Sequence, residues 1–168
     1  MQEISQQLQQ VLWRIAQACD KSARKADEVH LLAVSKYQQP SAIRIAYQAG
    51  QVDFGENYVQ EALDKMAQLS DLPLVWHLIG ALQSNKTAQV AAHFAWVHSV
   101  DRLKIAQRLS VQRPAHLPPL NICLQVNIDN QDSKSGCQVD ELAVLVQSIL
   151  PLPKLLLRGL MIIPQAGN

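Results

Sequence analysis

The chain has 168 residues, of which 48% are hydrophobic and 17% charged, a composition typical of one soluble globular domain. The formal net charge of +1 comes from interspersed acids and bases, so no charged segment for nucleic acid or an anionic membrane is visible. The first residues lack the basic and apolar regions of a secretory signal, and no apolar run is long enough to span a bilayer. We therefore expect a single cytoplasmic domain over residues 1–168, with neither nucleic acid nor membrane as a partner.

The three cysteines, Cys19, Cys123 and Cys137, form no Cys-x-x-Cys pair. Their odd number and their spacing predict neither a disulfide framework nor a zinc site. We expect reduced thiols, in agreement with a cytoplasmic location.

Apolar periodicity switches repeatedly between helix and strand patterns. Roughly the first 25 residues predict an amphipathic helix, and the continuous apolar run 29–34 predicts a strand buried in a parallel sheet. Further strands are expected at 52–54, 74–79, 95–98, 120–128 and 155–163, six in all. The helices expected between them are one capped by Ser41 and stopped at Gly50, three around residues 59–66, 90–94 and 103–109, and one over 140–150.

This alternation, with a repeat of roughly 25 residues, predicts parallel strands joined by right-handed crossovers. Both a (β/α) barrel and a doubly wound sheet satisfy it. No Gly-x-Gly-x-x-Gly follows the first strand, which disfavours the dinucleotide-binding form of the open sheet.

Lys36 stands directly after the first buried strand, the position from which barrels project site residues. A lysine that loses solvent there is destabilised as the ammonium and can supply the neutral amine that attacks an aldehyde. The alternative is a solvated lysine that merely ends a strand, and from position alone that is the more common outcome.

Asn57 and His77 end the second and third strands, and Ser84 and Lys86 follow on the same side. An amide can hydrogen-bond a polar ring substituent, and an imidazole can lie beside an aromatic ligand or transfer a proton. The structural alternatives are helix capping for Asn57 and Ser84, and a hydrogen-bonded core histidine for His77. Lys134, in a polar loop after the fifth strand, is compatible with phosphate or aldehyde capture or with plain solvent exposure.

Three ordered segments, Leu31–Lys36, Phe54–Glu61 and Trp76–Lys86, closely resemble motifs of the pyridoxal 5′-phosphate (PLP) homeostasis family, also called YggS/PROSC. Shorter similarities occur at Val100–Arg102, Gln125–Ile128, Ser133–Gly136 and Arg158–Met161. Together they cover essentially the whole chain.

The resemblance implies an α/β fold, a TIM-type (β/α) barrel of the alanine racemase N-terminal kind. It also implies that PLP is held as a Schiff base, an internal aldimine, on Lys36, with Asn57, His77 and Met161 lining the cofactor side. Ser84 is a further candidate contact, and no catalytic or metal-binding residue is expected.

The same resemblance implies a PLP carrier or buffer that keeps the free vitamin B6 aldehyde low and supplies it to PLP-dependent apoenzymes. Family members are monomers, and no catalytic turnover is expected. The alternative is a PLP-dependent amino-acid racemase or decarboxylase, although racemases of this class take a second acid or base from another domain. A third possibility is a nonfunctional remnant.

One departure from the family concerns the carboxyl end. The family's barrel has eight strands, and its last quarter carries a Ser-Met-Gly-Met-Ser type phosphate-binding turn and an arginine facing the pyridine nitrogen. This sequence ends before both. We therefore expect an incomplete barrel of six strands, weaker PLP binding, and open edge strands that favour self-association.

Overall fold

The computed structural model describes residues 2–129 and 135–164. Helices and strands alternate as the sequence predicts, with two short 3-10 helices, η1 and η2, beside them. The elements are α1 (Gln2–Lys21), η1 (Ala26–Glu28), β1 (Ala33–Val34), α2 (Pro40–Gln48), β2 (Asp53–Glu56), α3 (Val59–Gln68), β3 (Val75–Leu78), η2 (Ser84–Lys86), α4 (Thr87–His93), β4 (Trp96–Val100), α5 (Leu103–Gln112), β5 (Leu120–Val126), α6 (Leu142–Ile149) and β6 (Leu155–Ile162).

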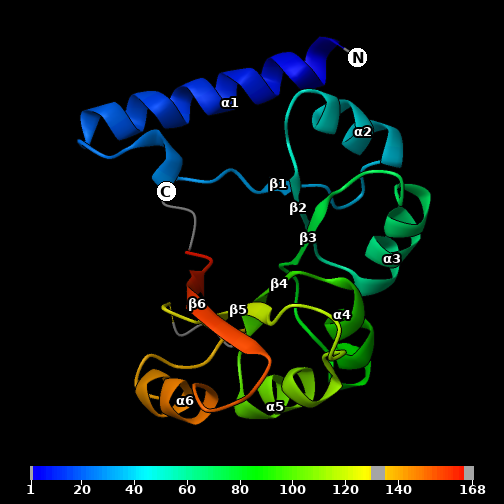
Figure 1. Cartoon of the computed structure of the whole chain (residues 1–168). Helices are drawn as coiled ribbons and strands as arrows, with labels where there is room; N and C mark the ends of the chain where they lie inside the picture. The colour runs from blue at the N-terminus through cyan, green and yellow to red at the C-terminus, as the bar shows by residue number, and fades with distance from the viewer. Residues whose placement is uncertain (1, 130–134, 165–168) are drawn as a thin grey trace.

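The strands form one parallel sheet in the order β1-β2-β3-β4-β5-β6. Figure 1 shows the sheet with α2 to α6 arranged along its outer side, which is the layer order of a (β/α) barrel. Among the described residues β1 and β6 do not pair with each other, so the sheet is open. The predicted α/β class and the incomplete barrel are confirmed.

The main core lies between the sheet and its outer helices. Phe54 of β2 and Trp76 of β3, with 6.2 Å between ring centroids, belong to one buried apolar cluster together with side chains of α2 to α6. Side chains alternate along a strand, so the neighbouring residues Gly55 and His77 face the concave side. The main apolar core therefore lies on the outer side of the sheet, and polar side chains such as His77 lie on the concave side.

Several element boundaries differ from the prediction, and those of β1, α2 and α6 are the most informative. β1 is confined to Ala33–Val34, because in the described sheet it is an edge strand bonded only to β2. α2 begins at Pro40 with Gln39 as its N-cap, so the prediction that Ser41 caps this helix is wrong. Proline suits the first helical turn because its missing N–H would have no partner there. α6 is also shorter than expected.

The amphipathic helix α1 buries only part of its apolar stripe. Leu8 and Cys19 are buried, whereas Val11 and Leu12 remain exposed. The helix packs against α2 and η1, and Figure 1 places it beyond the β1 end of the sheet. Because β1 is an open edge, the described chain offers too little apolar surface there to cover the rest of the stripe.

The cysteines form no disulfide among the described residues, as their spacing predicts. Cys19, Cys123 and Cys137 are buried and free. None of the described helices is both long enough and apolar enough to cross a membrane.

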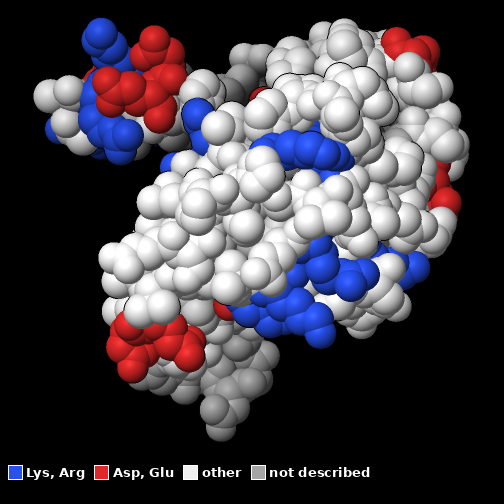
Figure 2. Space-filling view, turned by 60° about the horizontal axis from the view of Figure 1, so that its bottom comes forward, with Lys and Arg blue, Asp and Glu red and all other residues white. Residues whose placement is uncertain are grey.

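On the face drawn in Figure 2, however, Lys and Arg side chains form separate patches near the middle, and most acidic groups lie toward the margins, where one lobe carries both signs. The charges interspersed in sequence are thus grouped locally, and the absence of a nucleic-acid partner stays a prediction.

Candidate functional site

The carboxyl ends of the strands surround a pocket of about 250 Å³. Asn57 follows β2, Gly80 follows β3 and Asn127 follows β5, and because the strands are parallel these ends share one rim. Gly80 lies so close to Asn57 that an added Cβ atom would stand 2.2 Å from the Asn57 carbonyl oxygen. The lining combines amides, small residues and aliphatic side chains: Asn57, Ile79, Gly80, Ala81, Gln125, Val126, Asn127, Ser135 and Ile163.

Lys36 lies on the same rim, one strand further along the sheet. The Ser35 N–H donates to the Gly55 carbonyl at 2.9 Å, which sets the end of β1 beside the end of β2. Lys36 is exposed and is not one of the residues that line the pocket. The loss of solvent considered from the sequence is therefore wrong for this structure, in which Lys36 follows the edge strand of the described sheet.

His77 lies lower on the concave side, with both ring nitrogens engaged. Its Nε2 donates to Asp53 Oδ1 at 3.0 Å, and its Nδ1 accepts from His98 Nε2 at 2.9 Å. The ring stacks on Trp96, with 5.4 Å between centroids and 10° between planes. A carboxylate can only accept, so Asp53 fixes both tautomers. His77 is a hydrogen-bonded core histidine, and its contact with a cofactor stays a prediction.

Burial governs the two imidazoles of the histidine cluster, which comprises Asp53, His77, Trp96, His98 and Arg158. It lowers the pKa of His77, against the opposing hydrogen bond and charge of Asp53. It also lowers the pKa of His98 to about 4, and the neighbouring His77 adds to this effect. Arg158 lies over Trp96, with Cζ 5.6 Å from the ring centroid. Both imidazoles are therefore neutral at pH 7.

The capping roles considered for Ser84 and Asn57 are wrong. Ser84 is the first residue of η2, whose N-cap is Gln83 and which has no side-chain capping bond. Ser84 instead accepts through its carbonyl, from Thr87 Oγ1 at 2.9 Å. The N-cap of α3 is Tyr58, so Asn57 is left to line the pocket.

Two remaining candidates, Lys86 and Met161, are not among the residues that line the pocket. A second groove of about 530 Å³ runs beside it and brings Lys86 to the same groove as Asn57. Met161 is half-buried in β6, where it pairs with the pocket residue Gln125. Lys134 lies outside the described residues.

Two pocket residues, Gln125 and Asn127, were not among the predicted site residues. They stand two positions apart at the end of β5, so both face the concave side. Gln125 Nε2 donates to the Ser135 carbonyl at 3.0 Å and so attaches the following loop to the strand. Their sequence signal was the appearance of polar residues at alternate positions where an apolar strand ends.

Comparison with known proteins agrees with this geometry. The family model described as "Alanine racemase, N-terminal domain" matches residues 10–166. A pyridoxal phosphate homeostasis protein from Pseudomonas aeruginosa is 57% identical over 165 residues, which cover 98% of this chain and 72% of that relative. A protein of the same name from Escherichia coli K12 is 52% identical over 167 residues, covering 98% of this chain and 71% of that relative.

Solved structures give the same answer at the level of the fold. PipY from Synechococcus elongatus, solved with PLP bound, is 40% identical and superposes with a TM-score of 0.79, covering 92% of this chain and 72% of PipY. Alanine racemase from Corynebacterium glutamicum, at 14% identity, a TM-score of 0.66, and 95% and 44% coverage, shares the fold alone. The chain therefore belongs to the family of pyridoxal phosphate homeostasis proteins, built on the fold of the alanine racemase N-terminal domain.

Proposed function

We propose that this chain binds PLP at the rim pocket and holds it covalently on Lys36. The observation that carries the proposal is the rim itself, where an exposed primary amine follows one strand and a polar pocket lies at the ends of the next strands. PipY, 40% identical over most of this chain, has been solved with PLP bound.

The described pocket residues fit a pyridine ring. Asn57, Gln125 and Asn127 offer amide donors and acceptors for the polar substituents of such a ring, and Ile79 and Ile163 offer apolar surface for its faces. None of the described lining residues is cationic, so these residues suit the ring rather than the doubly charged phosphate.

PLP would supply an aldehyde, to whose carbon the Lys36 nitrogen forms a C=N bond while the aldehyde oxygen leaves as water. In this arrangement Asn57 orients the ring by hydrogen bonding, and Ile79 and Ile163 exclude water from its faces. His77, Met161 and Ser84 are secondary candidates, since they lie below the pocket, beside Gln125 and in η2 respectively.

The biological role that follows is PLP homeostasis. Such a protein buffers free PLP in the cytoplasm and releases it to PLP-dependent apoenzymes, without turnover of its own. The names of the curated relatives support this role, because they describe homeostasis and not a reaction.

The test is reduction of the PLP adduct with borohydride, followed by peptide mapping. We expect pyridoxyl on Lys36 in the unsubstituted chain and its loss in Lys36→Ala. Lys104→Ala, which removes an exposed lysine on α5, is the matched control and should leave the label on Lys36. If Lys36→Ala retains most of the label on another lysine, the assignment to Lys36 is wrong.

The racemase or decarboxylase alternative is not favoured by the curated relatives. This alternative predicts steady turnover of an amino acid, whereas a PLP carrier should show none. Median enzymes turn over at about 10 per second, so steady amino-acid turnover within a few orders of magnitude of that rate, abolished by Lys36→Ala, would reverse the choice.

A further inference from the structure

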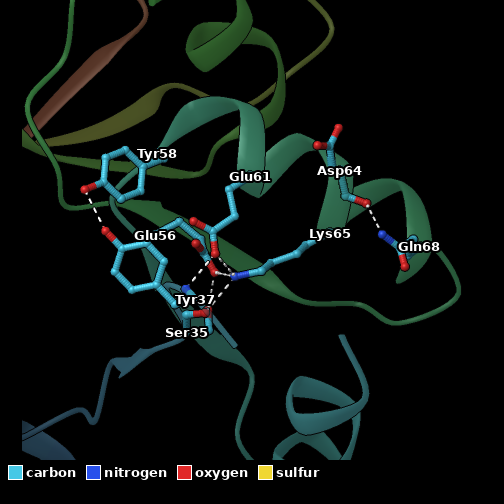
Figure 3. A network of polar contacts seen from close by, with 8 residues as sticks. All are labelled: Ser35, Tyr37, Glu56, Tyr58, Glu61, Asp64, Lys65 and Gln68. Atoms are coloured by element: carbon cyan, nitrogen blue, oxygen red, sulfur yellow. Dashed lines mark hydrogen bonds and ion pairs between the residues drawn. The ribbon is translucent and has the colours of Figure 1, made fainter. Parts of the chain in front are cut away.

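A buried lysine, Lys65 of α3, lies behind the loop that carries Lys36 (Figure 3). Lys65 is only 5% exposed. Its Nζ donates at 2.7 Å to each of three oxygens, the Ser35 carbonyl, Glu56 Oε1 and Glu61 Oε1. Three bonds use every donor of an ammonium group, so the position of Lys65 is fixed inside the protein.

The partners of Lys65 also bind the residues on both sides of Lys36. Ser35 Oγ donates to Glu56 Oε1 at 2.6 Å, and the Tyr37 N–H donates to Glu61 Oε1 at 2.6 Å. Tyr37 has a φ of 62°, a left-handed conformation that a residue with a Cβ keeps only when its surroundings impose it. The backbone is thus held on either side of an exposed Lys36.

We propose that Glu61, held by Lys65, is a positioning residue for Lys36. By accepting the Tyr37 N–H, Glu61 fixes the backbone turn from which the Lys36 amine reaches toward an aldehyde on the rim. The inference rests on the proposed function, because Lys36 is the residue that would bond to PLP. Glu61 acts through the backbone of Tyr37 and is not itself a catalytic residue.

The electrostatics of Glu61 suit this role. The hydrogen bond from Lys65 lowers the pKa of Glu61, and the backbone N–H of Tyr37 lowers it further, against partial burial. Glu61 is therefore a carboxylate near neutral pH, and a charged acceptor makes a stronger hydrogen bond than a neutral one.

The plain alternative is that these bonds only attach α3 to the sheet. A buried ion pair is a weak means of doing so, because desolvation offsets most of the attraction and an apolar side chain would pack as well. The oxygens that Lys65 reaches all belong either to the Lys36 loop, through Ser35, or to the two carboxylates that bond to it, Glu56 and Glu61. That selectivity points to control of the loop.

The experiment compares Glu61→Ala with Glu61→Gln, which keeps an acceptor oxygen for the Tyr37 N–H. Asp64→Ala is the control, because it removes an exposed carboxylate from the same helix, one bonded to Gln60 and not to the loop. Two quantities are measured. One is amide hydrogen exchange at Tyr37 without any PLP, and the other is the rate of borohydride-trapped pyridoxyl labelling at Lys36 relative to exposed Lys104.

For Glu61→Ala we expect amide exchange at Tyr37 to become at least about tenfold faster and the Lys36 to Lys104 labelling ratio to fall at least about tenfold. Small misplacements of a reacting group can cost up to about a hundredfold in rate. Glu61→Gln should recover most of both, and Asp64→Ala should match the unsubstituted chain. General loss of structure is recognised separately, because it would speed up amide exchange throughout the chain and not only at Tyr37.

Two results would overturn the inference: a Lys36 to Lys104 ratio in Glu61→Ala within about twofold of the unsubstituted chain, or no recovery in Glu61→Gln. Failure of the proposed function looks different. In that case the unsubstituted chain itself labels Lys36 no faster than Lys104. Glu61 then has no reaction at Lys36 to position, and the inference fails together with the proposed function.

Discussion

The histidine cluster should make the stability of the fold depend on pH between about 4 and 6.5. His98 has a pKa of about 4 in the folded chain against an ordinary value of 6.5, because it is buried beside His77. The folded pKa is the lower one, so the unfolded chain binds more protons in this window. Stability is therefore fully present above pH 6.5 and is lost as the pH falls toward 4.

The magnitude follows from the same two values. Each pKa unit corresponds to about 1.4 kcal/mol, so His98 alone accounts for up to about 3 kcal/mol of unfolding free energy across the window. His77 contributes in the same direction, because burial lowers its pKa as well. A loss of this size is a large part of the stability of a domain, which is typically about 5 to 15 kcal/mol.

The assay is urea unfolding at several pH values between 7.5 and 4.5, about the range of the expected titration. His98→Gln keeps a side-chain nitrogen near the position of Nε2 but cannot titrate, so its stability should fall less steeply, by up to about 1.4 kcal/mol per pH unit. His93→Gln, which removes an exposed histidine of α4, should keep the steep dependence. Parallel curves for His98→Gln and the unsubstituted chain would refute the argument.

Three further predictions concern other parts of the fold. Lys65→Met leaves the buried Glu56 without its cationic partner and should destabilise the chain by about 3 to 5 kcal/mol in urea unfolding. Gly80→Ala places a Cβ 2.2 Å from backbone and should lower the melting temperature and weaken PLP binding, whereas Gly55→Ala meets only side chains, at 3.2 Å and beyond, and should do less harm. Sedimentation should show concentration-dependent self-association, reduced by Leu160→Lys on the exposed edge strand β6.

The alternation of strands and helices could be predicted because it depends on local apolar periodicity. All six strands appear where the sequence indicates them. The extent of β1 could not be predicted, because run 29–34 reads as a buried strand while only Ala33 and Val34 pair with β2. Whether a strand is central or at an edge depends on neighbours distant in sequence, and apolar content alone does not encode that.

The site was predictable at the level of the rim and less so at the level of single side chains. Asn57 lines the pocket as a strand-end residue should. The exposure of Lys36 agrees with the solvated alternative that its position favoured, and in the structure Lys36 follows the edge strand β1. The burial of Lys65 was not visible, since a lysine on an amphipathic helix is normally solvated. Here the Ser35 carbonyl and the carboxylates of Glu56 and Glu61 offset the desolvation of its charge.

The state of His77 bears on the choice between binding and turnover. A general acid or base needs a ring nitrogen within hydrogen-bond reach of the substrate and a pKa near the working pH. His77 uses both nitrogens within the protein, and burial lowers its pKa. Lys36, by contrast, is open to solvent, so water can return to a C=N bond formed there and release the aldehyde again. Among the described residues, this arrangement supports reversible capture of PLP over proton transfer to an amino acid.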